Sequence, residues 1–256
     1  MLALSTSVDD TSLRVTEDEL TAYFSQYDAA GTTQADLFVA TRTNTTTNFS
    51  NIRALAINST DPEEFASITR DQLELIFTLR PQGGSYNIYS STRARTLDPF
   101  VTIVKIDSVS STSGDIDPYV APDGRTLYFS SGRDSSGSSI YHIYSATRSS
   151  VGVFDSPIAV SALGTTDDDR APLISADGLA LYFSSLRAPS AGERDMWVSH
   201  RATPTDSFGA PVPVSELNTA TSEQPTGISG DGCTLYFTRR NTMRTDRDFL
   251  VATKPQ

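Results

Sequence analysis

An acidic residue recurs at one fixed spacing throughout this 256-residue chain. It stands eight residues before an aspartate in each of five similar segments, and those aspartates are Asp18, Asp71, Asp123, Asp177 and Asp231. The recurring acids are Asp10, Glu63, Asp115, Asp169 and Glu223. Five carboxylates gathered on one axis would raise one another's pKa or hold a hard cation such as Ca²⁺. A short carboxylate can instead accept backbone N–H groups and fix a loop, and we favour this structural role.

Further charged residues stand around the third and fourth of these acids. They are Asp117, Asp167, Asp168 and Arg170. One interpretation is a cation or sugar site, and the other, which we favour, is a solvated loop in which Arg170 balances the acids. Apart from Ca²⁺, the sequence indicates no cofactor.

Other catalytic and metal-binding patterns are missing from the sequence. The single cysteine, Cys233, excludes an intrachain disulfide framework and any cysteine-based metal cluster. Neither a Gly-x-Ser-x-Gly elbow nor a His-Glu-x-x-His motif occurs. The sequence therefore identifies no catalytic residue and favours a protein that is not an enzyme, with enzymatic activity left open.

Composition narrows the classes of partner. The net charge is −11, and no stretch is rich in Lys and Arg, which argues against binding to a nucleic-acid backbone. No apolar run approaches the ~18–20 residues that a membrane-spanning helix needs. Ser and Thr make up roughly a quarter of the chain, which favours turn-rich β-structure over a helical bundle.

An internal repeat determines the expected architecture. The sequence Leu-Tyr-Phe at 127–129 returns at 181–183 and 235–237, with weaker copies in 20–25 and 73–78. The phenylalanines that these copies share are Phe24, Phe77, Phe129, Phe183 and Phe237. Subtraction gives steps of 53, 52, 54 and 54 residues, so the chain contains five units of about 53 residues.

Each unit predicts four short antiparallel strands. An Asp-Gly turn, as at 123–124, joins an apolar run to the Leu-Tyr-Phe strand; the first two units lack the glycine, so we expect looser turns there. A third strand ends in a base, which we assign to blade-to-blade ion pairs or surface charge; these bases are Arg42, Arg93, Arg148, Arg201 and Lys254. A fourth, proline-containing run fits an outer edge strand. Such units pack face to face as an all-β, five-bladed β-propeller.

The ends of the sequence indicate how the ring closes. The last unit stops at Gln256 without a fourth strand, and Leu4 aligns with Leu163 and Leu217 at the ends of other fourth strands. We therefore expect residues 1–5 to supply the outer strand of the last blade. The single domain of residues 1–256 then comprises repeats of about 6–58, 59–110, 111–164, 165–218, and 219–256 plus 1–5.

The repeat resembles the WD-repeat-like β-propeller units of the TolB type. The resemblance rests on Asp-x-x-Pro-x-x-Ser-x-Asp-Gly-x-x-Leu-Tyr-Phe-Ser-Ser-x-Arg, followed by Asp-x-Trp-Val and a closing Arg, and it is strongest at 115–133, 167–187 and 195–201. It implies a bacterial envelope or secreted setting and a protein-binding role. The N-terminal α/β domain of TolB has no counterpart here, so TolB's own partners are not carried over.

Three functions fit this architecture. The first is a non-catalytic scaffold that presents its channel-mouth loops to a protein or peptide. The second is a carbohydrate-active enzyme, a glycosidase or lyase, that uses axial carboxylates. The third is a sugar-binding lectin. We expect a monomer in the periplasm or outside the cell, with a signal peptide removed before Met1; a cytoplasmic location stays open because the sequence shows no such peptide.

Overall fold

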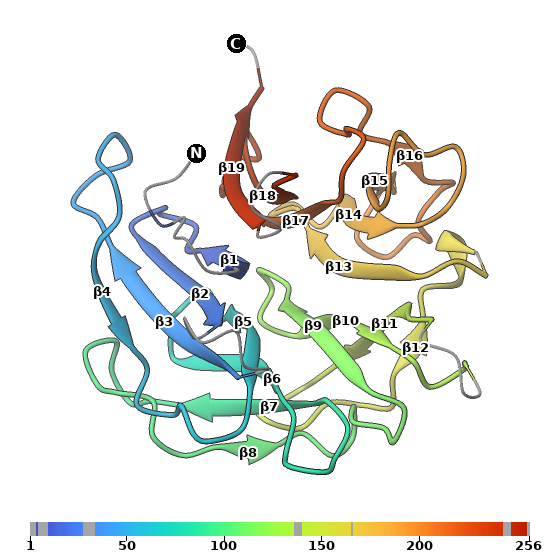
Figure 1. Ribbon diagram of the computed structural model, residues 1–256. Helices are drawn as coiled ribbons and strands as arrows, with labels where there is room; N and C mark the ends of the chain where they lie inside the picture. Colours follow the sequence, from blue (N-terminus) through green and yellow to red (C-terminus); the bar gives the residue numbers. More distant parts are fainter. Residues whose placement is uncertain are drawn as a thin grey trace.

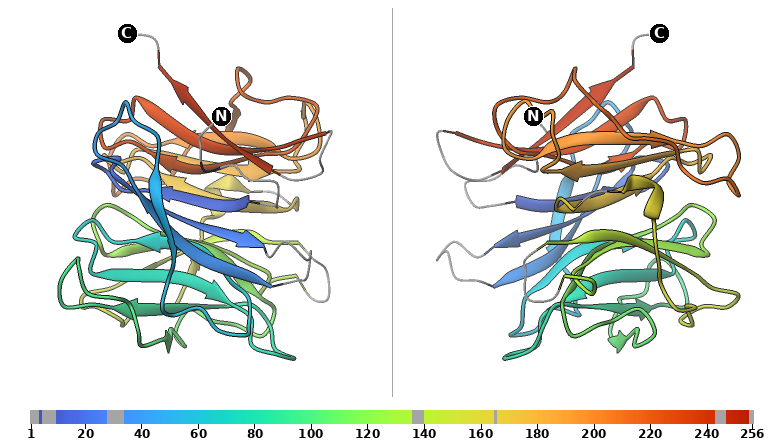
Figure 2. Two further views of the ribbon diagram at one scale, coloured as in Figure 1. Left: turned by 60° about the vertical axis from the view of Figure 1, so that its left-hand side comes forward. Right: turned by 90° about the vertical axis from the view of Figure 1, so that its right-hand side faces the viewer.

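The chain forms five antiparallel sheets that radiate from one axis as the blades of a propeller (Figure 1). Residues 4, 10–27, 34–135, 140–164, 166–242 and 247–254 are described by the computed structural model. Within each blade the strands follow chain order from the axis outward. Figure 2 shows the same ring from two sides. The prediction of an all-β, five-bladed propeller is confirmed.

The strands have the following bounds. The first blade holds β1 (Asp10–Val15), β2 (Thr21–Tyr27), β3 (Ala35–Thr41) and β4 (Ser50–Ala54). The second holds β5 (Glu63–Ile68), β6 (Glu74–Leu79), β7 (Asn87–Thr92) and β8 (Val104–Lys105). The third holds β9 (Asp115–Val120), β10 (Thr126–Ser131), β11 (His142–Thr147) and β12 (Ile158–Ala159). The fourth holds β13 (Asp169–Ile174), β14 (Ala180–Ser185), β15 (Asp195–His200) and β16 (Val212–Pro213). The fifth holds β17 (Glu223–Ile228), β18 (Thr234–Arg240) and β19 (Arg247–Thr253).

The ring is closed at its axis. Each innermost strand contacts the next around the circle, β1 to β5, β9, β13, β17 and back to β1. The outer strand expected from residues 1–5 lies outside the described residues except for Leu4. Leu4 is fully buried in a cluster that contains Phe24 of the first blade and Phe249 of the last. This residue therefore packs where the two ends of the ring meet.

The turns between the first and second strands keep one geometry in all five blades. Gly124, Gly178 and Gly232 take positive φ angles of 66°, 72° and 68° there. In the first two blades Glu19 and Gln72 adopt the same conformation, with φ of 58° and 60°. Their N–H groups still close the turn at 2.8 Å, so the expectation of looser turns is wrong. Glu19 and Gln72 carry backbone strain instead, because only glycine adopts a positive φ without steric cost.

The bases that end the third strands mostly contact groups of their own blades. Four guanidinium groups stack on a phenylalanine, with Cζ 4.3–4.7 Å from the ring centroid, and the pairs are Arg42–Phe49, Arg93–Phe100, Arg148–Phe154 and Arg201–Phe208. The Nε of each donates to a turn carbonyl of its own blade at 2.6–2.9 Å. Among the described members of this set, Arg148 alone makes an ion pair with a neighbouring blade, to Glu74 at 2.6 Å.

The innermost strands carry an irregularity that joins neighbouring blades. The third residue of four of them has a positive φ of 50–54°, at Ser12, Phe65, Asp117 and Ala171. The Phe65 N–H donates to Ser12 Oγ, and the Ala171 N–H donates to Asp117 Oδ2, each at 3.1 Å. At the corresponding position of β17 stands Pro225, which has no N–H and needs no acceptor on Ala171. At these irregularities, a backbone N–H of one blade therefore donates to a side chain of the preceding blade.

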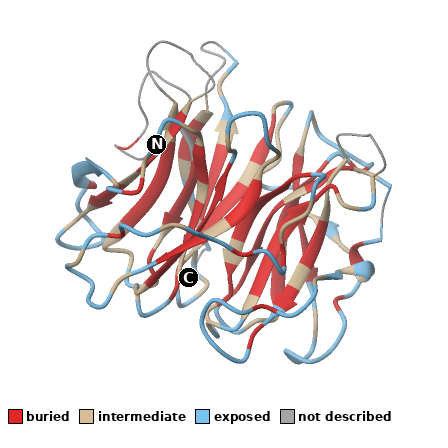
Figure 3. Cartoon of the chain, turned by 90° about the horizontal axis from the view of Figure 1, so that it is seen from below, coloured by how far each residue is buried: buried red, intermediate tan, exposed pale blue. Residues whose placement is uncertain are grey.

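The hydrophobic core is divided among the spaces between blades. Four buried clusters each combine side chains of two adjacent blades. Figure 3 shows burial running along the strands while the connections stay exposed. The shared phenylalanines of the repeat are all at most 3% exposed. In the described part of the chain, no helix has both the length and the apolar character needed to cross a membrane.

Candidate functional site

The five recurring acids each begin an innermost strand, at the face of the ring that we call the start face. The side chain of Asp10 lies outside what the structure describes. The other four are at most 2% exposed, and they are Glu63, Asp115, Asp169 and Glu223. Glu63 accepts the N–H of Ser59 at 3.2 Å and its hydroxyl at 2.5 Å. The carboxylates therefore bind loops of the protein.

In three of these sites an arginine at the end of the second strand of the same blade binds the carboxylate. Arg187 Nη2 lies 2.8 and 2.9 Å from the two carboxylate oxygens of Asp169, and Arg187 Nη1 donates to the Leu163 carbonyl at 3.1 Å. Asp115 and Glu223 have the same partner in Arg133 and Arg239, each at 2.9 Å. We call each carboxylate–arginine pair a loop clamp, because it ties the connection that enters a blade to the end of the second strand.

The loop clamps do not provide the surroundings of a Ca²⁺ site. Calcium takes six to eight oxygen ligands, whereas these carboxylates face N–H, hydroxyl and guanidinium donors. Among the residues that the structure describes, no group of three His, Cys, Asp or Glu could hold a metal ion. The geometry favours the structural role of these acids.

The additional candidates of the fourth blade lie at the start face, and one of them differs from the solvated loop we expected. Asp168 is 7% exposed and accepts the Tyr141 N–H at 2.8 Å. Arg170 and Arg194 pair with it at 2.9 and 2.5 Å. Burial opposes ionisation of Asp168, but these hydrogen bonds and charges outweigh it, so its pKa is lowered. Asp167 lies half-buried in the connection that enters β13.

Four charged side chains from successive blades form what we call the axial cluster. It consists of Arg14, Glu64, Asp117 and Arg170, all on innermost strands. Arg14 is 4% exposed, donates to the Thr226 carbonyl of β17, and lies with Cζ 5.1 Å from the ring centroid of Tyr119 on β9. One side chain thus connects three blades across the axis.

Glu64 is the member of the axial cluster whose pKa lies near neutral. It is 3% exposed, and the hydroxyls of Tyr27 and Tyr86 donate to its Oε1 at 2.9 and 3.4 Å. Burial raises the pKa of Glu64 to about 7, and the nearby charge of Asp117 acts in the same direction. Burial also raises the pKa of Asp117, against the charges of Arg170 and Arg14. A carboxyl that titrates near neutral pH is able to donate or accept a proton.

Glu64 was not among the candidates predicted from the sequence, because it does not recur in the repeat. At this position of the five units stand Thr11, Glu64, Ile116, Arg170 and Gln224, so the charged residues here break the repeat. A comparison of the units for their differences would have added Glu64 to Arg170, which was already a candidate. Arg14 had the same signal, since no other unit has a base at its position.

The opposite end of the axis opens into a hollow. We call this side the turn face, because the turns between first and second strands lie there. A basin of about 640 Å³ is lined by turn residues of four blades, namely Thr16, Glu17, Asp18, Arg70, Gln72, Ala176, Asp177 and Gly230. Next to it, toward the interior, a small cavity of about 50 Å³ is lined by Arg14 and Tyr119 among others. The basin is therefore open to solvent but narrows sharply at Arg14.

Solved structures share this fold at low sequence identity. TolB from Acinetobacter baumannii is 15% identical with a TM-score of 0.57, and the match covers 97% of this chain and 56% of that one. A thermostable family-43 glycoside hydrolase is 12% identical with a TM-score of 0.66, covering 98% and 91%. An α-L-arabinofuranosidase from Lactobacillus brevis is 14% identical with a TM-score of 0.61, covering 96% and 90%.

These likenesses establish the fold alone. The chain spans little more than half the length of TolB, and nearly all of the two glycoside hydrolases. No protein-family model matches the sequence, and no curated protein matches it. The resemblance to TolB-type propellers is thus confirmed as a resemblance of structure, and TolB and a glycoside hydrolase both share the fold.

Proposed function

We propose that this chain is a non-catalytic propeller that binds a protein or peptide segment at the turn face. The basin of about 640 Å³ carries the proposal, because turns from four of the five blades line it. Rigid strands hold those turns, which is how propellers position variable contact residues. Arg14 and Tyr119 narrow the axis below the basin, so a bound segment rests on the face instead of threading the ring.

The charges of the basin favour a cationic segment. Arg70 Nε pairs with Glu17 at 2.8 Å, which leaves Asp18 and Asp177 as the charges not balanced by Arg70. A hydrogen bond from the Ser175 hydroxyl lowers the pKa of Asp177, so this group stays ionised at neutral pH. Together with a net charge of −11, this electrostatic field attracts basic partners, and the association should weaken as salt rises.

Site-specific photocrosslinking tests this proposal. A photoreactive residue at Ala176, which is exposed in the basin, should give a discrete crosslinked product in the cells that make the protein. The same residue at Gln82, exposed on the start face, is the matched control. A synthetic peptide from the captured partner should then bind the purified chain in calorimetry. Crosslinking at Gln82 and none at Ala176 would contradict the proposal.

The proposed setting is the bacterial envelope or the secreted space, with the chain as a monomer. The TolB-type resemblance supports this setting, since the propeller matches TolB along 97% of its own length. Cell fractionation checks the location, and light scattering of the purified protein checks the monomeric state.

A carbohydrate-active enzyme is the second candidate, and one observation favours it. Glu64 and Asp117 are two carboxyls on neighbouring innermost strands, and the pKa of Glu64 is raised to about 7. Glycoside hydrolysis uses a pair of carboxyls in which the acid has a raised pKa. The similar structures include an endo-arabinase from Bacteroides thetaiotaomicron.

Hydrolysis assays separate the two candidates. Arabinan and aryl arabinofuranosides should release no product with this protein if the binding function is right. Product release that the Glu64→Gln substitution abolishes would replace the binding function with the enzymatic one. A glycan array tests the lectin alternative in parallel.

A further inference from the structure

A groove on the turn face separates the second blade from the third, and we call it the seam groove. Its volume is about 630 Å³. Leu73 of the second blade and Pro122 and Val151 of the third form its apolar lining. Val151 is 66% exposed, so a partner can reach its side chain. The groove therefore presents an apolar surface to solvent.

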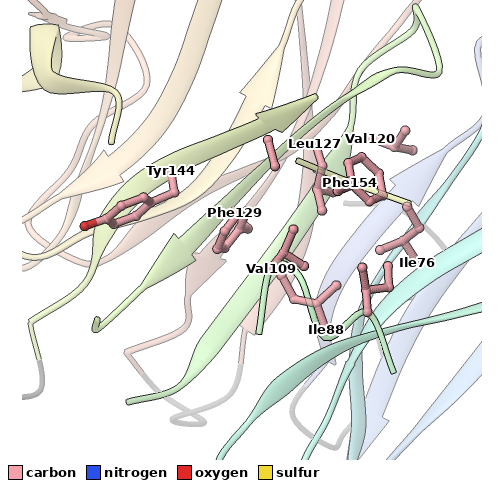
Figure 4. Close-up of a cluster of buried hydrophobic side chains, with 10 residues drawn as sticks. Ile76, Ile88, Val109, Val120, Leu127, Phe129, Tyr144 and Phe154 are labelled. Carbon is pink, nitrogen blue, oxygen red and sulfur yellow. The ribbon is translucent and has the colours of Figure 1, made fainter. Parts of the chain in front are cut away.

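A buried ring anchors the connection that carries Val151. Phe154 stands three residues later and is 3% exposed. It packs in one cluster with Ile76 of the second blade and Val120 of the third (Figure 4). Because Phe154 is held between the two blades, the connection is fixed beside the seam groove while Val151 stays exposed.

The apolar lining distinguishes this contact from other contacts of the ring. Its three positions lie two residues after a turn aspartate, one residue before the turn aspartate of the following blade, and three residues before the phenylalanine on which the strand-end arginine stacks. In the other contacts whose three positions the structure describes, at least one position carries a charged side chain. These sets are Leu20, Arg70 and Leu97; Arg125, Ala176 and Thr205; and Cys233, Glu17 and Thr46. The repeat therefore does not require an apolar lining here.

Two exposed aspartates also line the groove, Asp71 from the turn of the second blade and Asp123 from the turn of the third. Asp71 Oδ1 accepts the Thr69 hydroxyl at 2.6 Å, and this hydrogen bond lowers the pKa of Asp71, so the carboxylate stays ionised at neutral pH. Asp123 Oδ1 accepts two backbone N–H groups at 2.7 and 2.9 Å. Within the described residues neither aspartate makes an ion pair, so both charges are open to a partner.

Three arginines line the groove as well, and their charges face other groups. Arg70 Nε lies 2.8 Å from Glu17, and Arg148 Nη2 lies 2.6 Å from Glu74. Arg93 is directed toward the first blade, where its Nη2 donates to a tyrosine hydroxyl at 3.3 Å. Because each of the two ion pairs is neutral as a whole, the aspartates determine the charge that a ligand in the groove meets.

A lysine side chain combines the two properties that the groove complements. Its four methylene groups pack on apolar surface while its ammonium group stays in water. Turn hydrogen bonds already occupy Oδ1 of Asp71 and both oxygens of Asp123, so neither carboxylate has two free oxygens for the bidentate binding of an arginine. An ammonium group needs only one acceptor from each. We propose that the seam groove holds a lysine of the partner segment, with its stem on the apolar lining and its ammonium group at Asp71 and Asp123.

This inference rests on the proposed binding function and names the residue that is selected. Arg70 lines both the seam groove and the axial basin, so one extended segment reaches both. The basin attracts a basic segment by its charge, and the seam groove adds a requirement for the length of one side chain.

A titration followed by NMR tests the seam groove without any partner. The ¹⁵N-labelled full chain is titrated at low salt with the tripeptide acetyl-Ser-Lys-Ser-amide. Diaminobutyrate in place of lysine keeps the charge and removes two methylene groups, and norleucine keeps the carbon chain and removes the charge. The lysine peptide should shift the Gly124 and Val151 amides saturably and bind about fourfold tighter than the diaminobutyrate peptide, at about twofold for each half-buried methylene. The norleucine peptide should give no saturable shift.

Two variants separate the contributions of the stem and the charge. Val151→Thr introduces the residue that the first and fourth blades carry at this position, and should abolish the advantage of lysine over diaminobutyrate. Asp71→Asn combined with Asp123→Asn keeps oxygen acceptors in both turns, and should abolish the saturable response to both charged peptides.

Four outcomes would overturn the inference. They are no saturable shift at Gly124 and Val151, equal affinity for lysine and diaminobutyrate, tighter binding of norleucine, and unchanged binding in the Asn variant. The comparison of the three peptides on the unmodified chain decides even if a variant does not fold. Because the peptides need no partner, a groove that does not respond would overturn this inference alone, whereas a failure of crosslinking at Ala176 would count against the binding function.

Discussion

At the scale of single residues, the acids of this propeller differ in what neutralises them. Asp169 is buried, but both of its carboxylate oxygens lie within 2.9 Å of Arg187. Glu64 is equally buried, and it accepts hydrogen bonds from the hydroxyls of Tyr27 and Tyr86, which are neutral. Burial without a paired cation is the condition that raises a carboxyl pKa. Glu64 is therefore an acid through which pH near neutrality should act on this protein.

Stability should fall as pH rises through the range in which Glu64 ionises. Its pKa lies at about 7 in the folded protein against an ordinary value of 4.5, so between these values the folded state holds a proton that the unfolded state releases. Unfolding is then favoured by increasing pH, by up to about 3 kcal/mol at 1.36 kcal/mol per pH unit. The free energy of unfolding of Glu64→Gln, measured by denaturant titration from pH 5 to 8, should lack this decline. A variant that follows the unmodified protein across the whole range would contradict the assignment.

The same comparison explains what the sequence could and could not reveal about the site. A spacing of eight residues identified the recurring acids, but a residue present in every blade serves the architecture that every blade shares. Which way each side chain points depends on the partners that Arg133, Arg187 and Arg239 provide, and these lie 16–18 residues away. In the axial cluster, Asp117 and Arg170 were found as charged neighbours of the recurring acids, whereas Arg14 and Glu64 differ between blades and a search for recurring residues does not find them.

At the scale of elements, each loop clamp secures the connection through which the chain enters a blade. Arg187 contacts Asp169, the Ser185 hydroxyl and the Leu163 carbonyl, so one side chain joins three segments. Its guanidinium also stacks on Phe183, with Cζ 4.7 Å from the ring centroid. Such a contact holds the start of an innermost strand in place even where the neighbouring connection is long.

Breaking a loop clamp should cost far more than breaking an exposed ion pair. Arg187→Met leaves Asp169 buried without its cation, and the expected loss is about 3–5 kcal/mol of unfolding free energy. Arg240→Met removes an ion pair to Glu193 whose partners are 44% and 54% exposed, and should cost about 1 kcal/mol or less. Denaturant titration of both variants provides the measurement. Equal losses would show that Asp169 does not depend on Arg187.

Calcium should not stabilise the protein if the recurring acids act in loop clamps. A ligand that binds only the folded state raises the melting temperature as its concentration increases. Since guanidinium and N–H donors occupy the described carboxylates, calorimetry with millimolar Ca²⁺ and with a chelator should give the same melting temperature. A rise with Ca²⁺ would return these acids to the role of a cation site.

At the scale of the whole molecule, the repeat made the fold predictable. Phenylalanines at steps of 52–54 residues identified five units, and each now lies at the centre of a blade with at most 3% exposure. The pairing of strands within a blade could be predicted from the turn motifs, because a hairpin joins strands that are neighbours in the sequence. Contacts between blades join residues far apart in the chain, so the role of Arg148 and its ion pair with Glu74 could not be inferred from spacing.

At this scale, a substitution at Leu4 tests how the ring of blades is closed. Leu4 is fully buried beside side chains of the first and last blades, including Leu13 and Tyr236. Replacing a buried leucine by alanine costs about 2–5 kcal/mol. We therefore expect Leu4→Ala to lower the free energy of unfolding by that amount. Leu97, which is 96% exposed, provides the control, and Leu97→Ala should change stability by about 0.5 kcal/mol or less.

The two ends of the ring should also separate more easily in Leu4→Ala. Because Leu4 packs against both the first and the last blade, its loss should increase hydrogen exchange in β1 and β19 before it affects β9 in the third blade. A uniform increase in all five blades would mean that Leu4 supports the ring as a whole and has no special part in its closure. A local increase would show that the propeller opens where its ends meet, as expected of a ring that is fastened by packing at one point.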